Sequence, residues 1–139
     1  MSIVDSMYII KKTIDRSLNK VAKDSGLTLN EIRVLLFLYE NEKFDIASDI
    51  VEELMISKAH VSLSVEELAK KSYIEKVRSK EDKKKVHLKI NNNAKEVLDL
   101  LDIEIKKLKE NLLKDISDKD VLAFKETLKK IIENTKYMK

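Results

Sequence analysis

Apolar residues recur at helical spacing along most of the chain. Between residues 3 and 21 they follow one another at steps of three or four, which places Ile3, Met7, Ile10, Ile14, Leu18 and Val21 on one helix face. Gly26 then offers the left-handed conformation that ends a helix. The same spacing predicts further helices over about 30–39, within 47–54 and over 58–71. Ser57, a good N-cap, ends a short turn, so residues 47–71 are predicted to form a helix-turn-helix.

After the predicted helix-turn-helix, the spacing of apolar residues changes to that of a strand and later returns to that of a helix. Val86, Leu88 and Ile90 alternate with polar residues, as in a half-buried strand, and Tyr73, Ile74 and Val77 are also β-type residues. The very polar segment 78–85 separates them, so the pattern predicts a β-hairpin with a charged tip. Helical spacing returns over 94–112 and 121–132, the latter after a Ser117-x-x-Asp120 helix start.

Composition agrees with a mainly α fold and excludes several kinds of chemistry. The 139 residues, 43% of them hydrophobic, suffice for one domain, taken here as 1–139. With one Gly and no Cys, the chain has neither a glycine-rich phosphate loop nor thiolate chemistry, and no cofactor is expected. The longest stretch free of charge is seven residues, 59–65, whereas a membrane span needs about 20. No secretory signal is visible either, and we expect a cytoplasmic protein without a membrane segment.

The net charge of +3 conceals a strong local asymmetry. Residues 70–89 contain nine basic and three acidic residues, whereas residues 40–67 contain eight acidic residues and two lysines. A basic run is usually only a solvated surface, but this one falls on a hairpin that directly follows a helix-turn-helix. That order is a winged helix-turn-helix, whose second helix fits the DNA major groove while its wing contacts phosphates or the minor groove. The sequence therefore predicts sequence-specific binding of double-stranded DNA.

Candidate DNA-contacting residues follow from this arrangement. Val61 and Val65 are expected in the core, whereas polar residues in the first turns of the second helix are expected to contact bases or phosphates. The alternative for His60 is an exposed side chain without a function. The candidates are Ser57, Lys58, His60, Ser62 and Ser64 on the helix, and Arg78, Lys80, Lys83, Lys84 and Lys85 on the wing.

Enzyme and metal sites find little support in the sequence. His60 and His87 are the only histidines, and they lack the spacing of a metal pair, so we expect no metal. No Ser/His/Asp spacing suggests a catalytic triad, and we expect no enzymatic activity. Asp82 is expected to brace the wing by pairing with a neighbouring basic residue rather than to act as a catalytic acid.

The terminal segments 1–26 and 94–139 carry apolar seams that the lobe 27–93 has little surface to cover. Packing within one chain is one possibility. The other is a homodimer of interleaved helices, which sets two recognition helices about 34 Å apart, the spacing of an inverted-repeat operator.

The chain also resembles the MarR family of bacterial transcriptional regulators. The resemblance rests on the "LT" at 27–28, on "IVEELMISKAHVSLSVEEL" and on "SYIEKVRSKEDKKKVHLKINNNA". It implies a winged helix-turn-helix homodimer, dimerised by N- and C-terminal helices, that represses transcription. It also implies a small, often aromatic ligand that binds between the dimerisation helices and the DNA-binding lobe and weakens DNA binding. The aromatic residues available to line such a cavity are Tyr8, Phe37, Tyr39 and Tyr73.

Several positions depart from the family's pattern, including Ile90-Asn91 in place of the Leu-Thr pair that ends the second wing strand. Leu63 stands where an arginine often reaches DNA, Lys84 replaces a wing arginine, and Ser72 replaces the glycine before the first wing strand. Lysine supplies charge without the planar fork of arginine. The alternative is an interaction module with this fold that no longer reads DNA and pairs with another regulator. It is motivated by Leu63, the acidic stretch 40–67 and the missing wing arginines.

Overall fold

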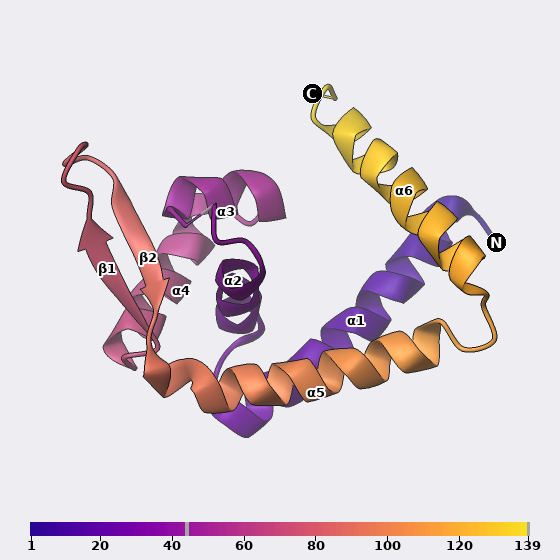
Figure 1. Ribbon diagram of the computed structural model, residues 1–139, viewed down its shortest axis with the longest axis horizontal. Coiled ribbons are helices and arrows are strands. Elements are labelled where there is room, and N and C mark those ends of the chain that lie inside the picture. Colours follow the sequence, from indigo (N-terminus) through magenta and orange to yellow (C-terminus); the bar gives the residue numbers. More distant parts are fainter. Residues whose placement is uncertain (44, 139) are drawn as a thin grey trace. The chain divides into compact units, whose positions relative to one another are not determined.

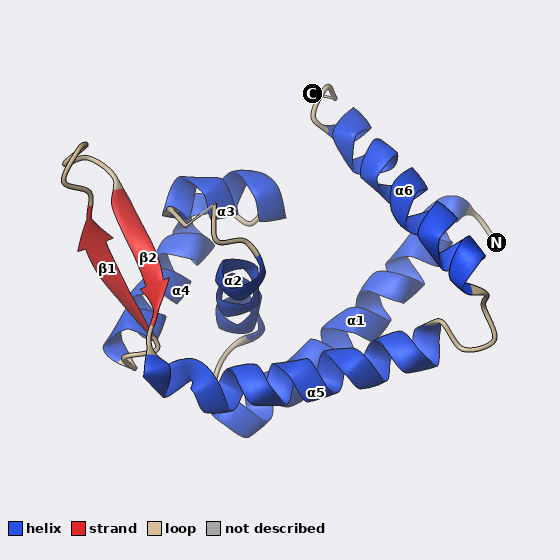
Figure 2. Cartoon of the chain, in the orientation of Figure 1, coloured by secondary structure: helices blue, strands red, loops and turns tan. Residues whose placement is uncertain are grey.

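The computed structural model describes residues 1–43 and 45–138 (Figures 1 and 2). The elements are α1 (Ile3–Ser25), α2 (Leu29–Glu40), α3 (Ala47–Leu54), α4 (Lys58–Lys70), β1 (Ile74–Arg78), β2 (Val86–Ile90), a 3-10 turn (Asn92–Ala94), α5 (Lys95–Leu112) and α6 (Asp118–Thr135). The prediction of a mainly α protein with one β-hairpin wing is confirmed. Among the described residues, no helix has both the length and the apolar content needed to cross a membrane.

The chain divides into two compact units, residues 1–106 and 107–139. Within the first unit, the flanking helices α1 and α5 share the core of the lobe 27–93. Leu18 and Ala22 of α1 and Val97 and Leu101 of α5 are all buried in the same cluster as the lobe's own side chains. In the second unit, the described part of α6 buries no residue.

Local signals set the helix ends as predicted. The Ser57 hydroxyl accepts a hydrogen bond from the backbone N–H of His60 at 3.2 Å at the start of α4. Ser117 does the same for Asp120 at the start of α6. Each hydroxyl satisfies a backbone donor that the first helical turn leaves free. Gly26 follows α1 with φ of 67°, the left-handed cap that the sequence indicated.

The core of the first unit centres on α2. Ile32, Val34 and Leu35 are completely buried. Helix α4 packs against α2, and its Val61 and Leu68 are buried in the same core cluster. The prediction that Val61 and Val65 belong to the core is confirmed. A helix with one buried face presents the opposite face to solvent, so this packing determines which side of α4 is available to a partner.

Ser72 explains why the family pattern has glycine before the first wing strand. Its φ is 61°, in the left-handed region where a Cβ atom is unfavourable and glycine is free of strain. We therefore expect Ser72→Gly to raise the free energy of unfolding by about 1 kcal/mol, measured by urea denaturation. Ser62→Gly, within the right-handed helix α4, is the matched control and is expected to lower it by about 0.5 kcal/mol. A loss of stability in Ser72→Gly would contradict this explanation.

Candidate nucleic-acid interface

The exposed face of α4 is defined by the residues that the helix buries. Val61, Ser64, Val65 and Leu68 lie on the buried side. The side chains on the opposite face are exposed to solvent: Ala59, Ser62, Leu63, Glu66 and Lys70. The exposed face is therefore apolar at its centre, where Leu63 is 62% exposed. The sequence-based candidates did not include Ala59 or Leu63, although the helical period of the buried residues would have placed both on this face.

Most of the predicted α4 candidates are accessible, and one is not. Ser57, Lys58, His60 and Ser62 are exposed. Ser64 is only 4% exposed, and its selection as a DNA contact was wrong. It lies three residues after Val61 and four before Leu68, so the helical period turns it toward the core.

The two acidic residues of α4 are paired with lysines. Glu66 makes an ion pair with Lys76 of β1, and the hydrogen bond and positive charge of Lys76 lower the pKa of Glu66. Glu67 lies 3.4 Å from the Nζ of Lys70. Pairing reduces the repulsion that these carboxylates would exert on phosphates, and the Glu66–Lys76 pair also links α4 to the wing.

The wing is held to the body of the first unit by a contact with the segment before α3. β1 and β2 are antiparallel, with Val77 opposite His87. The backbone N–H of Leu88 donates to the carbonyl of Asp45 at 2.8 Å. His87 Nδ1 lies 2.6 Å from Asp45 Oδ1. From the sequence, His87 was considered only as a metal ligand. In the structure its contact with Asp45 helps to position β2, the second strand of the wing.

The wing tip, residues 79–85, is folded by its own polar side chains and in Figure 1 points away from α5. Asp82 Oδ1 accepts from the backbone N–H of Lys84 at 3.0 Å, and Ser79 Oγ accepts from that of Asp82 at 3.2 Å. Asp82 thus stabilises the tip by a hydrogen bond to the backbone of Lys84. The sequence had predicted instead that it pairs with a basic side chain. Arg78 donates to the carbonyl of Lys83 at 3.0 Å, so its guanidinium is partly engaged within the wing.

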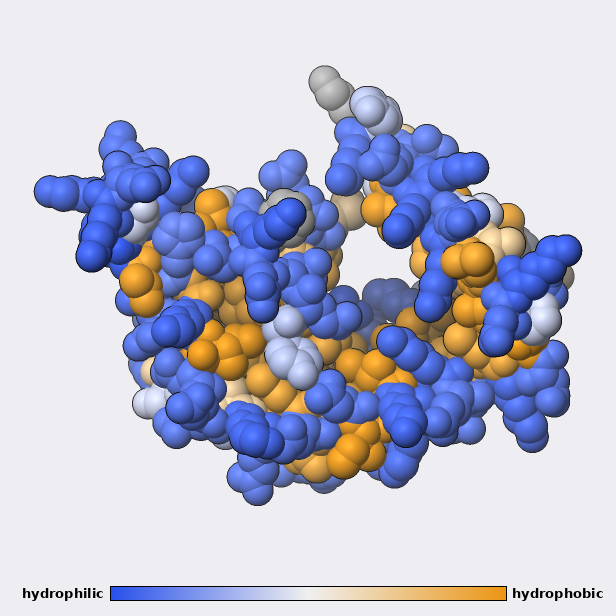
Figure 3. Space-filling model, viewed as in Figure 1, coloured by the Kyte–Doolittle hydropathy of each residue, from blue (hydrophilic) through white to orange (hydrophobic). Residues whose placement is uncertain are grey.

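Four lysines of the wing tip are exposed: Lys80, Lys83, Lys84 and Lys85. Within residues 1–43 and 45–138, no carboxylate lies within 4.0 Å of their ammonium groups. Figure 3 shows hydrophilic side chains covering the projecting hairpin at the upper left. A partner with regularly spaced negative charges would therefore contact four exposed lysines here, and two carboxylates, Glu81 and Asp82.

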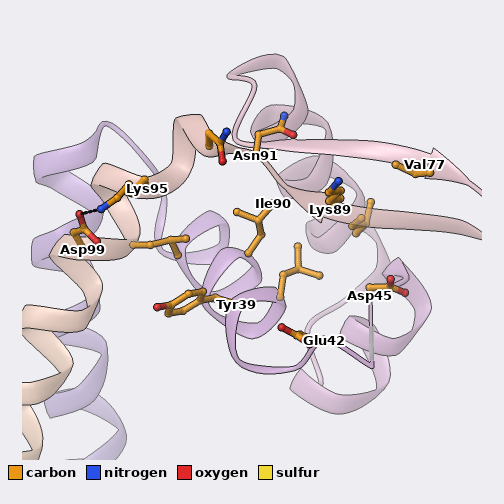
Figure 4. A pocket seen from close by; sticks show the side chains of 13 residues that line it. Tyr39, Glu42, Asp45, Val77, Lys89, Ile90, Asn91, Lys95 and Asp99 are labelled. Carbon is orange, nitrogen blue, oxygen red and sulfur yellow. Dashed lines mark hydrogen bonds and ion pairs between the residues drawn. The ribbon is translucent and has the colours of Figure 1, made fainter.

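A pocket of about 740 Å³ lies between α2, the wing strands and the start of α5 (Figure 4). Its apolar lining comes from Leu38, Val77, Leu88, Ile90 and Leu98, and charged residues that include Asp45, Lys95 and Asp99 also line it. Tyr39 is the only one of the four suggested aromatic residues that lines it.

The hydroxyl of Tyr39 also joins α2 to α5. It donates to Asp102 at 3.2 Å, and the negative charge of Asp102 raises the pKa of Tyr39. This hydrogen bond connects α2 and α5, and both helices contribute residues to the lining of the pocket. Among the described residues, no group of three or more His, Cys, Asp or Glu side chains is placed to hold a metal ion.

Comparisons with known proteins agree with this geometry. The sequence model described as "Transcriptional regulator SarA/Rot" matches residues 16–101. No curated protein sequence matched the chain. A putative MarR family transcriptional regulator from Listeria monocytogenes, solved in complex with a 26mer DNA, superposes with a TM-score of 0.85 at 21% identity, covering 96% of this chain and 89% of that one.

Two further solved structures are similar over nearly their whole length. A MarR transcriptional regulator from Methanosarcina mazei Go1 gives a TM-score of 0.83 at 14% identity, with 99% of this chain and 98% of that one covered. Wild-type MarR from E. coli in its apo form gives 0.72 at 17% identity, with 94% and 97% covered. At these identities the structural likeness shows the fold, which is the one that the sequence resemblance predicted.

Proposed function

The chain belongs to the SarA/Rot family of transcriptional regulators, and we propose that it regulates transcription by binding double-stranded DNA as a homodimeric repressor. The family and the similar solved structures are regulators rather than enzymes. The observation that carries the proposal is the exposed face of α4 beside a wing tip whose four exposed lysines have no carboxylate partner among residues 1–43 and 45–138. The solved relative in complex with a 26mer DNA supports the same use of the fold. Such a regulator would act in the cytoplasm.

In the proposed complex, α4 lies in the major groove and the wing lies along the backbone. Lys58, His60 and Ser62 occupy the first turns of α4, the part of a recognition helix that reaches base edges. The lysines of the wing tip would neutralise phosphates and release counterions, which supplies affinity without sequence information. Sequence reading would therefore come from α4 and affinity largely from the wing.

The dimer is proposed from apolar surfaces that the described chain leaves uncovered. In α1, Ile3 is 78% exposed and Met7 50%. In α6, Phe124 is 56% exposed and Ile132 52%. Exposed apolar surface of this kind on each helix is typical of a protein interface. A second copy would cover it by twofold symmetry, and two recognition helices about 34 Å apart would match an inverted-repeat operator.

Modulation by a small ligand is proposed at the pocket beside Tyr39. The pocket contacts α2, both wing strands and α5, so a ligand that favours one placement of the wing would change DNA affinity. The effector itself is to be found by adding candidate compounds to the DNA titration described next, where a true effector weakens binding by wild type. Tyr39→Phe keeps the ring and removes the hydroxyl, and a reduced response in this variant would support the site.

The proposal is tested by titrating full-length protein onto duplex DNA from upstream of its own coding sequence. Fluorescence anisotropy at several salt concentrations is expected to show nanomolar binding. Because eight lysines of two wing tips meet the DNA, the slope of log K against log salt is expected to be about −7. The control is a shuffled duplex, which should bind at least a hundredfold more weakly. An intact dimer that binds no duplex at low salt would refute DNA binding and favour the interaction module.

A further inference from the structure

The exposed face of α4 has an apolar centre that phosphate binding does not explain. Leu63 is 62% exposed, and Ala59, one helical turn before it, is also exposed. Both lie opposite the buried Val61 and Leu68, so they face the same partner as the rest of the exposed surface. We call Ala59 and Leu63 the apolar patch of α4.

The two acidic residues of α4 beside this patch are each paired with a lysine. Glu66, the next residue along this face, makes its ion pair with Lys76 of the wing. Ser62 contributes only a small hydroxyl. Leucine and alanine side chains have no hydrogen-bond donor, so the patch has no means of binding a guanine edge or a phosphate through their side chains.

One group in the DNA major groove suits such a patch. Each base pair presents hydrogen-bonding atoms there, but only thymine adds an exposed 5-methyl group, which apolar side chains contact. Resting on the proposed DNA binding, we infer that Leu63 and Ala59 contact thymine methyl groups. Leu63 is then a specificity-determining residue that favours thymine at one or two positions of each half-site.

The experiment removes the methyl group and nothing else. Full-length protein first selects its best duplex from a random-sequence library, and each thymine of that duplex is then replaced by deoxyuridine. Burial of one methyl-sized group corresponds to a change in affinity of about fourfold. We expect wild type to bind about fourfold more weakly at the contacted positions, and within twofold of the parent duplex elsewhere, in anisotropy titrations.

Leu63→Ala tests whether this residue reads the methyl group. The variant is expected to bind thymine and uracil duplexes within twofold of each other at the positions that Leu63 contacts, and to keep the wild-type preference at any position that only Ala59 contacts. Leu100→Ala, at an exposed leucine of α5, is the matched control and should keep the fourfold preference. Because Leu63 is exposed, its removal should leave the thermal unfolding midpoint within about 3 °C of wild type.

Several results would overturn the inference. Tight binding with no thymine preference at any position would reject methyl reading and leave the proposed function intact. Equal weakening of thymine and uracil duplexes by Leu63→Ala would reject the role of Leu63. If Leu63→Ala leaves binding and preference unchanged, Leu63 does not contribute to DNA binding and the inference is refuted. Selection of no duplex at low salt would refute the proposed function, and with it the inference.

Discussion

Replacing Lys83, Lys84 and Lys85 together by alanine is expected to weaken DNA binding at least a hundredfold at 0.15 M salt. The three ammonium groups project from the wing tip without an acidic partner among the described residues. A dimer would lose six phosphate contacts, so the slope of log K against log salt should become shallower by about five. The hairpin should still form, because its tip is folded by Ser79 and by the Asp82 side chain.

The matched control removes the same charge from another exposed surface. Lys125, Lys129 and Lys130 are exposed lysines of α6, and their joint replacement by alanine should change DNA affinity less than threefold. Anisotropy titrations at four salt concentrations provide both affinity and slope. Equal losses in the two triple variants would mean that overall charge, rather than the wing, governs binding.

Introducing a charge into the apolar face of α6 is expected to separate the dimer. Phe124→Glu and Ile132→Glu each place a carboxylate where we propose that a second copy packs, and burying an unpaired charge is strongly unfavourable. The mass from light scattering should fall from twice 16.1 kDa to 16.1 kDa. A monomer engages only one half-site, so affinity for an inverted repeat should fall at least a hundredfold.

A charge on the polar face of the same helix serves as the control. Lys130→Glu is expected to leave the mass at the dimer value, because its side chain is exposed and lies away from Phe124 around the helix. Circular dichroism should show that all three variants keep their helices. Dimers of unchanged mass in Phe124→Glu and Ile132→Glu would contradict the proposed interface.

The spacing of apolar residues and the residues that cap helix ends were sufficient to predict most of the helices and strands. The ends at Gly26, Ser57 and Ser117 depend on contacts within four residues, which is why they were predicted correctly. Ser64 could also have been placed in the core from its spacing to Val61 and Leu68. Ser64 was predicted to be exposed because its side chain is polar. Its position in the helical period indicates the core instead, and the structure agrees with that position.

The roles of several polar residues could not be predicted in this way. His87 and Asp45 are 42 residues apart, and Asp45 precedes α3 with no periodic signal of its own. Glu66 meets Lys76 only because β1 returns beside α4. Arg78 donates to a carbonyl across the wing tip. Each contact depends on how separate elements pack, which spacing along the chain does not specify.

The sequence alone thus determined the helices, the single hairpin, the position of the basic segment and the absence of thiol chemistry, because these depend on residue type and on neighbours a few positions away. Tertiary packing decided which face of α4 is exposed to solvent, which acidic residues are paired, and where the flanking helices join the core. The physical reason is that burial and ion pairing are properties of side chains brought together in space. Leu63, a departure from a family pattern in the sequence, lies in the structure at the centre of the exposed face of α4.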